Sequence, residues 1–177
     1  MTAGYCTKCG NGYYLDYVHV YENGACKICG AAEPSAPAPA VTTASKSIAD
    51  LIVSEGWTNT TTSQTFKLDD VVTVQIKGGS NSGKAYDGDH IRIYATDTPA
   101  GSMTISVAEG YELVSIKITT SEGTYAFLCV EGTETDISNT VVEVSGSSVV
   151  LNTIRNGDGG KQVRVLAIEV VYQTVAE

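Results

Sequence analysis

Histidine and tryptophan are scarce in this sequence of 177 residues, which contains two histidines and one tryptophan. The histidines, His19 and His90, lie far apart along the chain. A Ser/His/Asp or Cys/His relay would therefore depend on His90, and no G-x-S-x-G sequence accompanies it. The carboxylates of Asp69 and Asp70 are adjacent in an expected turn, where neighbouring side chains diverge. These absences predict a protein that is not an enzyme.

Basic residues are also few: eleven Lys and Arg face twenty Asp and Glu, which gives a net charge of -9. All of this net charge falls on residues 47–177, with eight basic and seventeen acidic residues, whereas the first 46 residues are formally neutral. Affinity for nucleic acid rests largely on Lys and Arg that neutralise phosphates. The composition therefore argues against a nucleic-acid partner.

Long apolar runs are missing as well. No stretch of 18 apolar residues occurs, so we expect no membrane-spanning helix. Residues 1–5 lack the basic start and the apolar centre of a secretory signal. A cysteine motif follows almost at once, which is consistent with a segment of a longer protein.

Four of the five cysteines form two Cys-x-x-Cys-Gly units that are separated by sixteen residues: Cys6, Cys9, Cys26 and Cys29. This spacing is typical of a four-cysteine zinc site, in which each pair of thiolates holds one side of a tetrahedral ion. The intervening residues predict a hairpin with its turn at Glu22–Gly24. Residues 1–30 are too few to bury a core, so metal or disulfides must supply their folding free energy.

Residues 5–30 resemble the zinc ribbons, which implies structural zinc held by the four cysteines. The same residues are similar to cysteine-rich repeats of some extracellular receptors and protist surface proteins, where Gly-Tyr-Tyr-Leu follows the Cys-x-x-Cys pair. Those repeats use disulfides, and four cysteines allow three pairings. We favour zinc because both pairs carry a trailing glycine, Gly10 and Gly30, and because the loop length fits one ribbon. His19 is a spare ligand or a plain strand residue, and Cys129, in an apolar strand, is expected to be buried.

Residues 31–46 contain three prolines that alternate with small residues. Proline favours extended backbone, so this segment predicts a semi-rigid linker of Pro, Ala, Ser and Thr. The alternative is an ordered strap that packs on the larger domain.

Residues 47–177 predict a second domain that is mainly β. A short helix is expected first, with Ser47 as its cap and with Ile48, Leu51 and Ile52 on one side. Apolar residues then alternate with polar ones in several segments, the signature of half-buried strands. Their expected inward residues are Val72, Val74, Ile76, Met103, Ile105, Val107, Val114, Ile116 and Ile118. The last strand changes parity between Val165 and Ile168, which predicts a bulge near Leu166 and Ala167. Eight or nine short strands with Gly, Asn, Asp and Ser turns indicate an antiparallel β-sandwich or barrel.

This domain resembles a jelly-roll β-sandwich module of secreted and surface proteins of gut bacteria, which is similar in style to carbohydrate-binding modules. The matching residues are Gly88, Ile91, Arg92, Tyr94, Ile105, Val114, Ile116, Ile118, Val165, Ile168, Glu169, Val170 and Tyr172. The resemblance implies a jelly-roll fold, an extracellular or cell-surface location, and binding of a glycan or a surface protein without chemistry.

Exposed aromatic rings beside polar groups suit a sugar, because its CH face stacks on a ring while its hydroxyls need directional partners. The richest such cluster comprises Trp57, Tyr86, Asp87, Asp89, His90, Arg92 and Tyr94. In the plainer interpretation, Trp57 closes the core, Tyr94 packs at a sheet edge and the residues between them form a polar turn.

Calcium is a further candidate cofactor, since oxygen ligands crowd residues 81–89 and 156–160. Neither stretch has the EF-hand spacing. Two functions follow from the sequence: a non-catalytic module that binds a glycan or a cell surface, and a structural surface protein, an adhesin or filament subunit, that self-associates through strand edges.

Overall fold

The computed structural model describes residues 20–27, 30, 32–33, 38–60, 64–122, 126–157 and 161–175. The chain divides into two compact units, residues 1–38 and 39–177. In the first unit, β1 (Tyr21–Glu22) and β2 (Ala25–Cys26) form an antiparallel hairpin. Its turn residues Asn23 and Gly24 have φ angles of 53° and 76°, as a type I′ turn requires at both central positions. The predicted hairpin turn at Glu22–Gly24 is confirmed.

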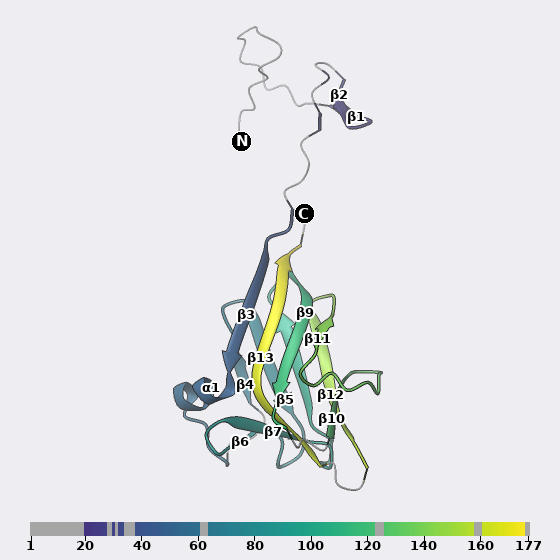
Figure 1. Ribbon diagram of the computed structural model, residues 1–177. Coiled ribbons are helices and arrows are strands. Elements are labelled where there is room, and N and C mark those ends of the chain that lie inside the picture. The colour runs from purple at the N-terminus through teal and green to yellow at the C-terminus, as the bar shows by residue number, and fades with distance from the viewer. Residues whose placement is uncertain are drawn as a thin grey trace. The chain divides into compact units, whose positions relative to one another are not determined.

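The second unit consists of two antiparallel sheets, which confirms the predicted mainly β sandwich (Figure 1). One sheet contains, in spatial order, β10 (Ala126–Val130), β12 (Ser148–Arg155), β8 (Ser102–Val107), β5 (Val72–Lys77) and β4 (Thr65–Lys67). The other contains β11 (Val141–Glu143), β9 (Tyr111–Thr120), β13 (Gln162–Thr174), β7 (His90–Tyr94) and β6 (Lys84–Tyr86), with β3 (Val41–Ser47) also paired to β13. We call them the five-stranded and the six-stranded sheet.

Strand β13 organises the six-stranded sheet. It pairs with β9 on one side, while β7 occupies the first part of its other side and β3 the rest. The register of the β13–β9 pair shifts between Val165 and Ala167, close to this change of partner. The predicted bulge near Leu166 and Ala167 is therefore confirmed, and it keeps Val165 and Ile168 both in the core.

The expected boundary between linker and sandwich needs correction. Residues 41–46 were assigned to the linker, yet β3 (Val41–Ser47) pairs with β13 from Gln173 to Ala167. Figure 1 shows β3 and β13 side by side. Within β3 only Ala44 is buried, so the strand lacks the apolar alternation by which the other strands were predicted. For these residues the alternative of an ordered strap is the one that the structure shows.

Helix α1 (Ile48–Glu55) follows β3 directly and confirms the predicted helix. Ser47 caps it, since its side chain accepts a hydrogen bond of 3.1 Å from the Asp50 backbone N–H. Ile48 and Leu51 are buried, and Ile52 packs on the core. The helix ends at Gly56, whose left-handed backbone donates to the Ile52 carbonyl.

The core lies between the sheets and contains most of the residues that the alternation predicted. The confirmed residues are Val72, Val74, Ile76, Met103, Ile105, Ile116 and Ile118, while Val107 packs on the core at its edge. Val114 was predicted wrongly: at the second register shift of the β13–β9 pair it is the extra, unpaired residue of β9, and Leu113 points inward instead. Cys129 is fully buried as expected. Burial, together with the nearby charges of Asp136 and Glu134, raises the pKa of its thiol.

Candidate functional site

The hairpin of β6 and β7 brings four of the predicted ligand-binding residues together. Tyr86 lies directly opposite His90 in the register. Asp89 precedes His90 directly, and Arg92 follows it two residues later. We call Tyr86, Asp89, His90 and Arg92 the hairpin cluster. Ile91 and Ile93 of β7 are fully buried in the core, so the alternating residues His90, Arg92 and Tyr94 belong to the outer face of the six-stranded sheet.

The rings and the guanidinium of the hairpin cluster are stacked on one another. The Arg92 guanidinium carbon lies 3.4 Å from the centroid of the Tyr86 ring. The His90 ring is nearly parallel to that of Tyr86, at an interplanar angle of 17° and a centroid distance of 6.1 Å. Arginine over an aromatic face gains a cation–π attraction, which favours this arrangement on a half-buried ring. One face of the Tyr86 ring is therefore occupied by the Arg92 guanidinium.

Hydrogen bonds hold the His90 ring in one orientation. Arg92 Nε–H donates to His90 Nε2 at 3.2 Å, so this nitrogen is an acceptor and the ring proton resides on Nδ1. Nδ1 faces Asp89 Oδ1 at 2.5 Å. The carboxylate side chain of Asp89 is 61% exposed, whereas that of His90 is 5% exposed. A buried, neutral imidazole thus connects an exposed carboxylate to the guanidinium.

Trp57 is not part of these contacts. Its ring packs edge-on against Phe66, with centroids 5.1 Å apart, and lies against the core. The structure favours the plainer interpretation of Trp57 as a residue that closes the core. Tyr94 ends β7, and its backbone N–H donates to Ser82 Oγ at 2.9 Å. Asp87 lies in the turn of the hairpin with a φ angle of 52°.

The carboxylate of Asp97 holds the loop that precedes β6, and we call this set of contacts the Asp97 latch. Asp97 Oδ2 accepts hydrogen bonds from the backbone N–H groups of Asn81 and Ser82 and from Ser82 Oγ, and Oδ1 accepts from Asn81 Nδ2. Ser82 is fully buried. The latch fixes where β6 begins and hence where Tyr86 lies, and its carboxylate is occupied by four donors.

The predicted zinc site falls largely outside the described residues, and so does part of one of the two calcium candidates. Cys6, Cys9 and Cys29 of the expected zinc site lie outside them, as does Asp158 of one calcium candidate. Cys26 is described and buried, at the end of β2. Within the described ranges, no group of three or more His, Cys, Asp or Glu could hold a metal ion.

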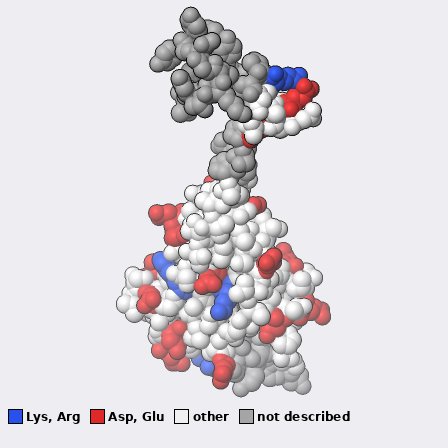
Figure 2. Space-filling view, turned by 45° about the horizontal axis from the view of Figure 1, so that its top comes forward, with Lys and Arg blue, Asp and Glu red and all other residues white. Residues whose placement is uncertain are grey.

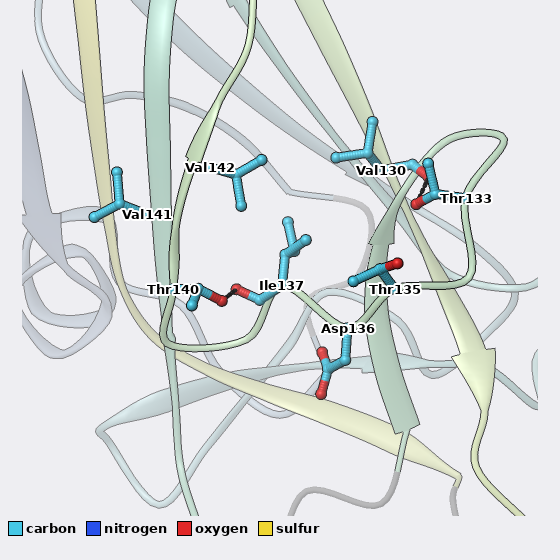
Figure 3. Close-up of a pocket in the computed structure, with 8 residues that line it drawn as sticks. All are labelled: Val130, Thr133, Thr135, Asp136, Ile137, Thr140, Val141 and Val142. Atoms are coloured by element: carbon cyan, nitrogen blue, oxygen red, sulfur yellow. Dashed lines mark hydrogen bonds between the residues drawn. The ribbon is translucent and has the colours of Figure 1, made fainter.

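A second candidate site is a depression of about 360 Å³ at the edge of the sandwich (Figure 3). Its lining comes from the end of β10, from the loop 131–140 and from β11: Val130, Thr133, Thr135, Asp136, Ile137, Thr140, Val141 and Val142. Figure 3 shows Ile137 between Val142 and Thr135. Asp136 Oδ1 accepts from the Leu128 and Ser138 backbone and from Ser138 Oγ, so this carboxylate supports the loop. The surface that remains is largely apolar.

Two basic residues beside the hairpin cluster were missed by the sequence analysis. Lys84 lies opposite Arg92 on β6, and Arg164 lies opposite Arg92 on β13. Alternation in the sequence indicates that Arg164 points away from the core between Val163 and Val165. This alternation does not reveal that β13 is the neighbour of β7, because that pairing depends on the order of strands in the sheet.

Comparisons with protein families, with curated proteins and with solved structures found no match to this chain. Among the described residues, no helix is long and apolar enough to cross a membrane.

Proposed function

We propose that this protein is a non-catalytic binding module that recognises a glycan outside the cell or on a cell surface. The observation that carries the proposal is the hairpin cluster, in which the Tyr86 ring, the Arg92 guanidinium and the His90 imidazole are stacked on the outer face of a sheet. An aromatic ring supplies a flat apolar surface for the CH face of a sugar. Asp89, Arg92 and the Tyr86 hydroxyl supply acceptors and donors for its hydroxyl groups.

The cluster is held in place before any ligand binds. Arg92 is fixed through its Nε by His90, and His90 is fixed through Nδ1 by Asp89. The Asp97 latch fixes the start of β6. Side chains that are already ordered lose less conformational entropy on binding, so a small site on a rigid sheet gains affinity. This arrangement supports binding without a chemical step.

A glycan array followed by calorimetry tests the proposal. We expect Tyr86→Ala to abolish retention of the glycan that the native protein binds, because the stacking surface is lost. Tyr86→Phe keeps the ring and should weaken binding by less. Thr104→Ala, on the outer side of β8 in the opposite sheet, is the control and should bind like the native protein. Equal retention by the native protein and Tyr86→Ala would contradict the proposed site.

A second candidate function is self-association as an adhesin or filament subunit. It is favoured by β11, a three-residue strand at the edge of the six-stranded sheet, where Val141 is 63% exposed beside the apolar depression. An edge strand offers backbone donors and acceptors to another chain. Sedimentation over a range of concentrations decides between the functions: assembly that Val141→Lys prevents, without glycan retention, favours this second candidate.

The proposed module includes a structural zinc ion in its N-terminal unit, bound by Cys6, Cys9, Cys26 and Cys29. Two described features support this part of the proposal. Cys26 lies at the end of the β1–β2 hairpin, and Gly30 after the second pair has a φ angle of 67° and donates its N–H to the Cys26 carbonyl at 2.8 Å. A chain reversal at this glycine suits a cysteine knuckle.

A further inference from the structure

A row of basic residues crosses three neighbouring strands of the six-stranded sheet. Lys84 of β6 lies opposite Arg92 of β7, and Arg92 lies opposite Arg164 of β13. Residues that face each other across antiparallel strands belong to the same face of the sheet. The neighbours Ala85, Ile91, Val163 and Val165 are buried in the core, so the row lies on the outer face. We call Lys84, Arg92 and Arg164 the basic row.

The composition of the domain does not explain the basic row. Residues 47–177 contain eight basic and seventeen acidic residues, so three adjacent cations are a local concentration against the overall charge. In Figure 2, acidic side chains are spread over the visible face of the sandwich with few basic ones between them. Like charges directly opposite each other destabilise a sheet, and the basic row contains two such pairs in succession.

No carboxylate of the described residues forms an ion pair with the basic row. The ion pair among the described residues is that of Lys27 with Glu22, and Asp89 is hydrogen-bonded to the neutral His90 ring. Of the other nearby acids, Asp97 is occupied by its four donors, and the exposed Asp89 faces His90. Lys84 Nζ has one long contact of 3.4 Å, to the amide oxygen of Asn81. The positive charge of the row is therefore not compensated within this part of the chain.

Two buried polar atoms at one end of the basic row have no hydrogen-bond partner among the described residues. These atoms are Arg164 Nε and Ser121 Oγ. The two residues are neighbours, since Ser121, directly after β9, donates its backbone N–H to the Arg164 carbonyl of β13 at 3.0 Å. A buried donor without a partner is costly, and such atoms in a folded protein call for an explanation. The Nε of Arg164 therefore has no acceptor among the described residues.

Arg92 is fixed in the middle of the basic row. Its Nε donates to His90 and its plane rests on the Tyr86 ring, while its two terminal nitrogens have no hydrogen bond to any described residue. A guanidinium with a fixed plane presents parallel N–H groups, which match the two oxygens of a carboxylate or of a sulfate group. The ring of Tyr86 in the same cluster provides an apolar surface beside this charge.

We propose that the basic row binds the anionic substituent of an acidic glycan, either the carboxylate of a uronic acid or a sulfate ester. This inference rests on the proposed glycan-binding function and specifies its ligand class. Arg92 and Arg164 contact the anionic group, Lys84 adds a further positive charge, and Tyr86 contacts the sugar ring. The two anionic groups share one recognition chemistry, so the experiment separates them.

Affinity for three polymers tests the inference: polygalacturonate, dextran sulfate and unsubstituted dextran, measured by calorimetry at one ionic strength. We expect the native protein to prefer one of the two acidic polymers over dextran. Arg164→Gln should weaken that binding roughly ten- to hundred-fold, as expected for the loss of a charge-assisted hydrogen bond. Lys117→Gln removes a cation from β9, where it lies opposite Glu169 and outside the basic row, and should change the affinity little. Circular dichroism confirms that each variant is folded.

The outcomes separate this inference from the proposed function. Preference for an acidic polymer that Arg164→Gln removes and Lys117→Gln retains supports both, and the polymer identifies the anionic group. Equal binding of dextran and the acidic polymers overturns the inference but not the glycan function. If no polymer binds, the proposed function fails. Thermal unfolding in sodium sulfate, compared with sodium chloride of equal ionic strength, then decides whether the basic row binds an anion. Stabilisation by sulfate that is absent in Arg164→Gln then supports the site, and no difference overturns it.

Discussion

The hydroxyl of Tyr172 on β13 donates a hydrogen bond of 2.8 Å to Asp69 Oδ2, in the turn between β4 and β5. The bond joins the two sheets of the sandwich across 103 positions of sequence. The other oxygen of Asp69 accepts from the backbone N–H groups of Val71 and Val72, at 2.8 and 2.7 Å. One carboxylate therefore organises a turn and also connects it to the opposite sheet. The ring of Tyr111 packs edge-on against that of Tyr172.

Replacement of Asp69 by alanine should destabilise the protein by about 1–3 kcal/mol, because buried donors lose their acceptor. Asp70→Ala is a matched control: Asp70 is the adjacent, exposed carboxylate, and substitution of such a surface residue usually changes stability by less than about 0.5 kcal/mol. Urea unfolding of both variants measures the difference. Equal midpoints for the two variants would show that Asp69 has no special role.

The contribution of Asp69 to the free energy of unfolding should depend on pH in the acid range. Burial acts to raise the pKa of Asp69, but hydrogen bonds from the Val72 backbone, Tyr172 and the Val71 backbone outweigh it, and the pKa lies below its ordinary value of 3.8. A carboxyl with a lowered pKa stabilises the folded state above the unfolded pKa and loses this effect as the pH falls through the folded pKa. The stability difference between native protein and Asp69→Ala should shrink below about pH 4. A difference that stays constant down to pH 2 would contradict this assignment.

The contribution of Tyr172 to the free energy of unfolding should depend on pH in the alkaline range. Burial, followed by the hydrogen bond to Asp69 and the charge of Asp69, raises the pKa of the Tyr172 hydroxyl above its ordinary value of 10.0. A raised pKa stabilises the folded state below the unfolded pKa, and the effect is lost as the pH rises through the folded pKa. Tyr172→Phe should therefore cost about 1 kcal/mol at neutral pH and less above about pH 10. Unfolding curves at pH 7 and pH 10.5 measure this change, and an equal cost at both pH values would refute it.

Gly101 is a position where even one methyl group should not fit. A Cβ there would lie 2.5 Å from Ile93 Cγ2 and from Ser82 Oγ, and 2.9 Å from the Tyr94 backbone nitrogen. Gly101→Ala should destabilise the protein by about 1–3 kcal/mol, as overpacking does in other cores. Because the clash involves the end of β7, it should also weaken ligand binding at the hairpin cluster. Ser80→Ala, at an exposed position of the preceding loop, serves as the control, and thermal unfolding of both variants measures the effect.

Metal content and free thiols, measured together on protein purified without chelator, test the proposed zinc site. We expect about one zinc per chain and no disulfide, as for a four-cysteine structural site. Cys26→Ser should lower the bound zinc, whereas Cys129→Ser, in the core of the sandwich, should retain it. Two disulfides without metal would instead identify the N-terminal unit as an oxidised extracellular repeat.

Much of the fold could be predicted from local patterns. The helix at Ile48–Glu55 follows from its cap and its apolar side, and most inward residues follow from alternation. Strand β3 could not be predicted in this way. It pairs with β13 in the sheet but buries one residue, so its sequence lacks the alternation of apolar and polar residues. Val114 was misplaced because it is itself the extra residue of a bulge in β9. Its apolar side chain continues the alternation of Ile116 and Ile118, so the sequence shows no change of parity there.

The sequence by itself determined which residues alternate toward the core, where the turns lie and which residues of the Tyr86–Arg92 hairpin come together, since a short hairpin brings sequence neighbours into contact. Only the tertiary structure decided that Trp57 packs on Phe66 in the core and that Arg164 lies beside Arg92. Both depend on contacts between segments far apart in the chain, and the order of strands in a sheet sets such contacts. The basic row is therefore a property of the sheet order, and no single segment of the sequence contains it.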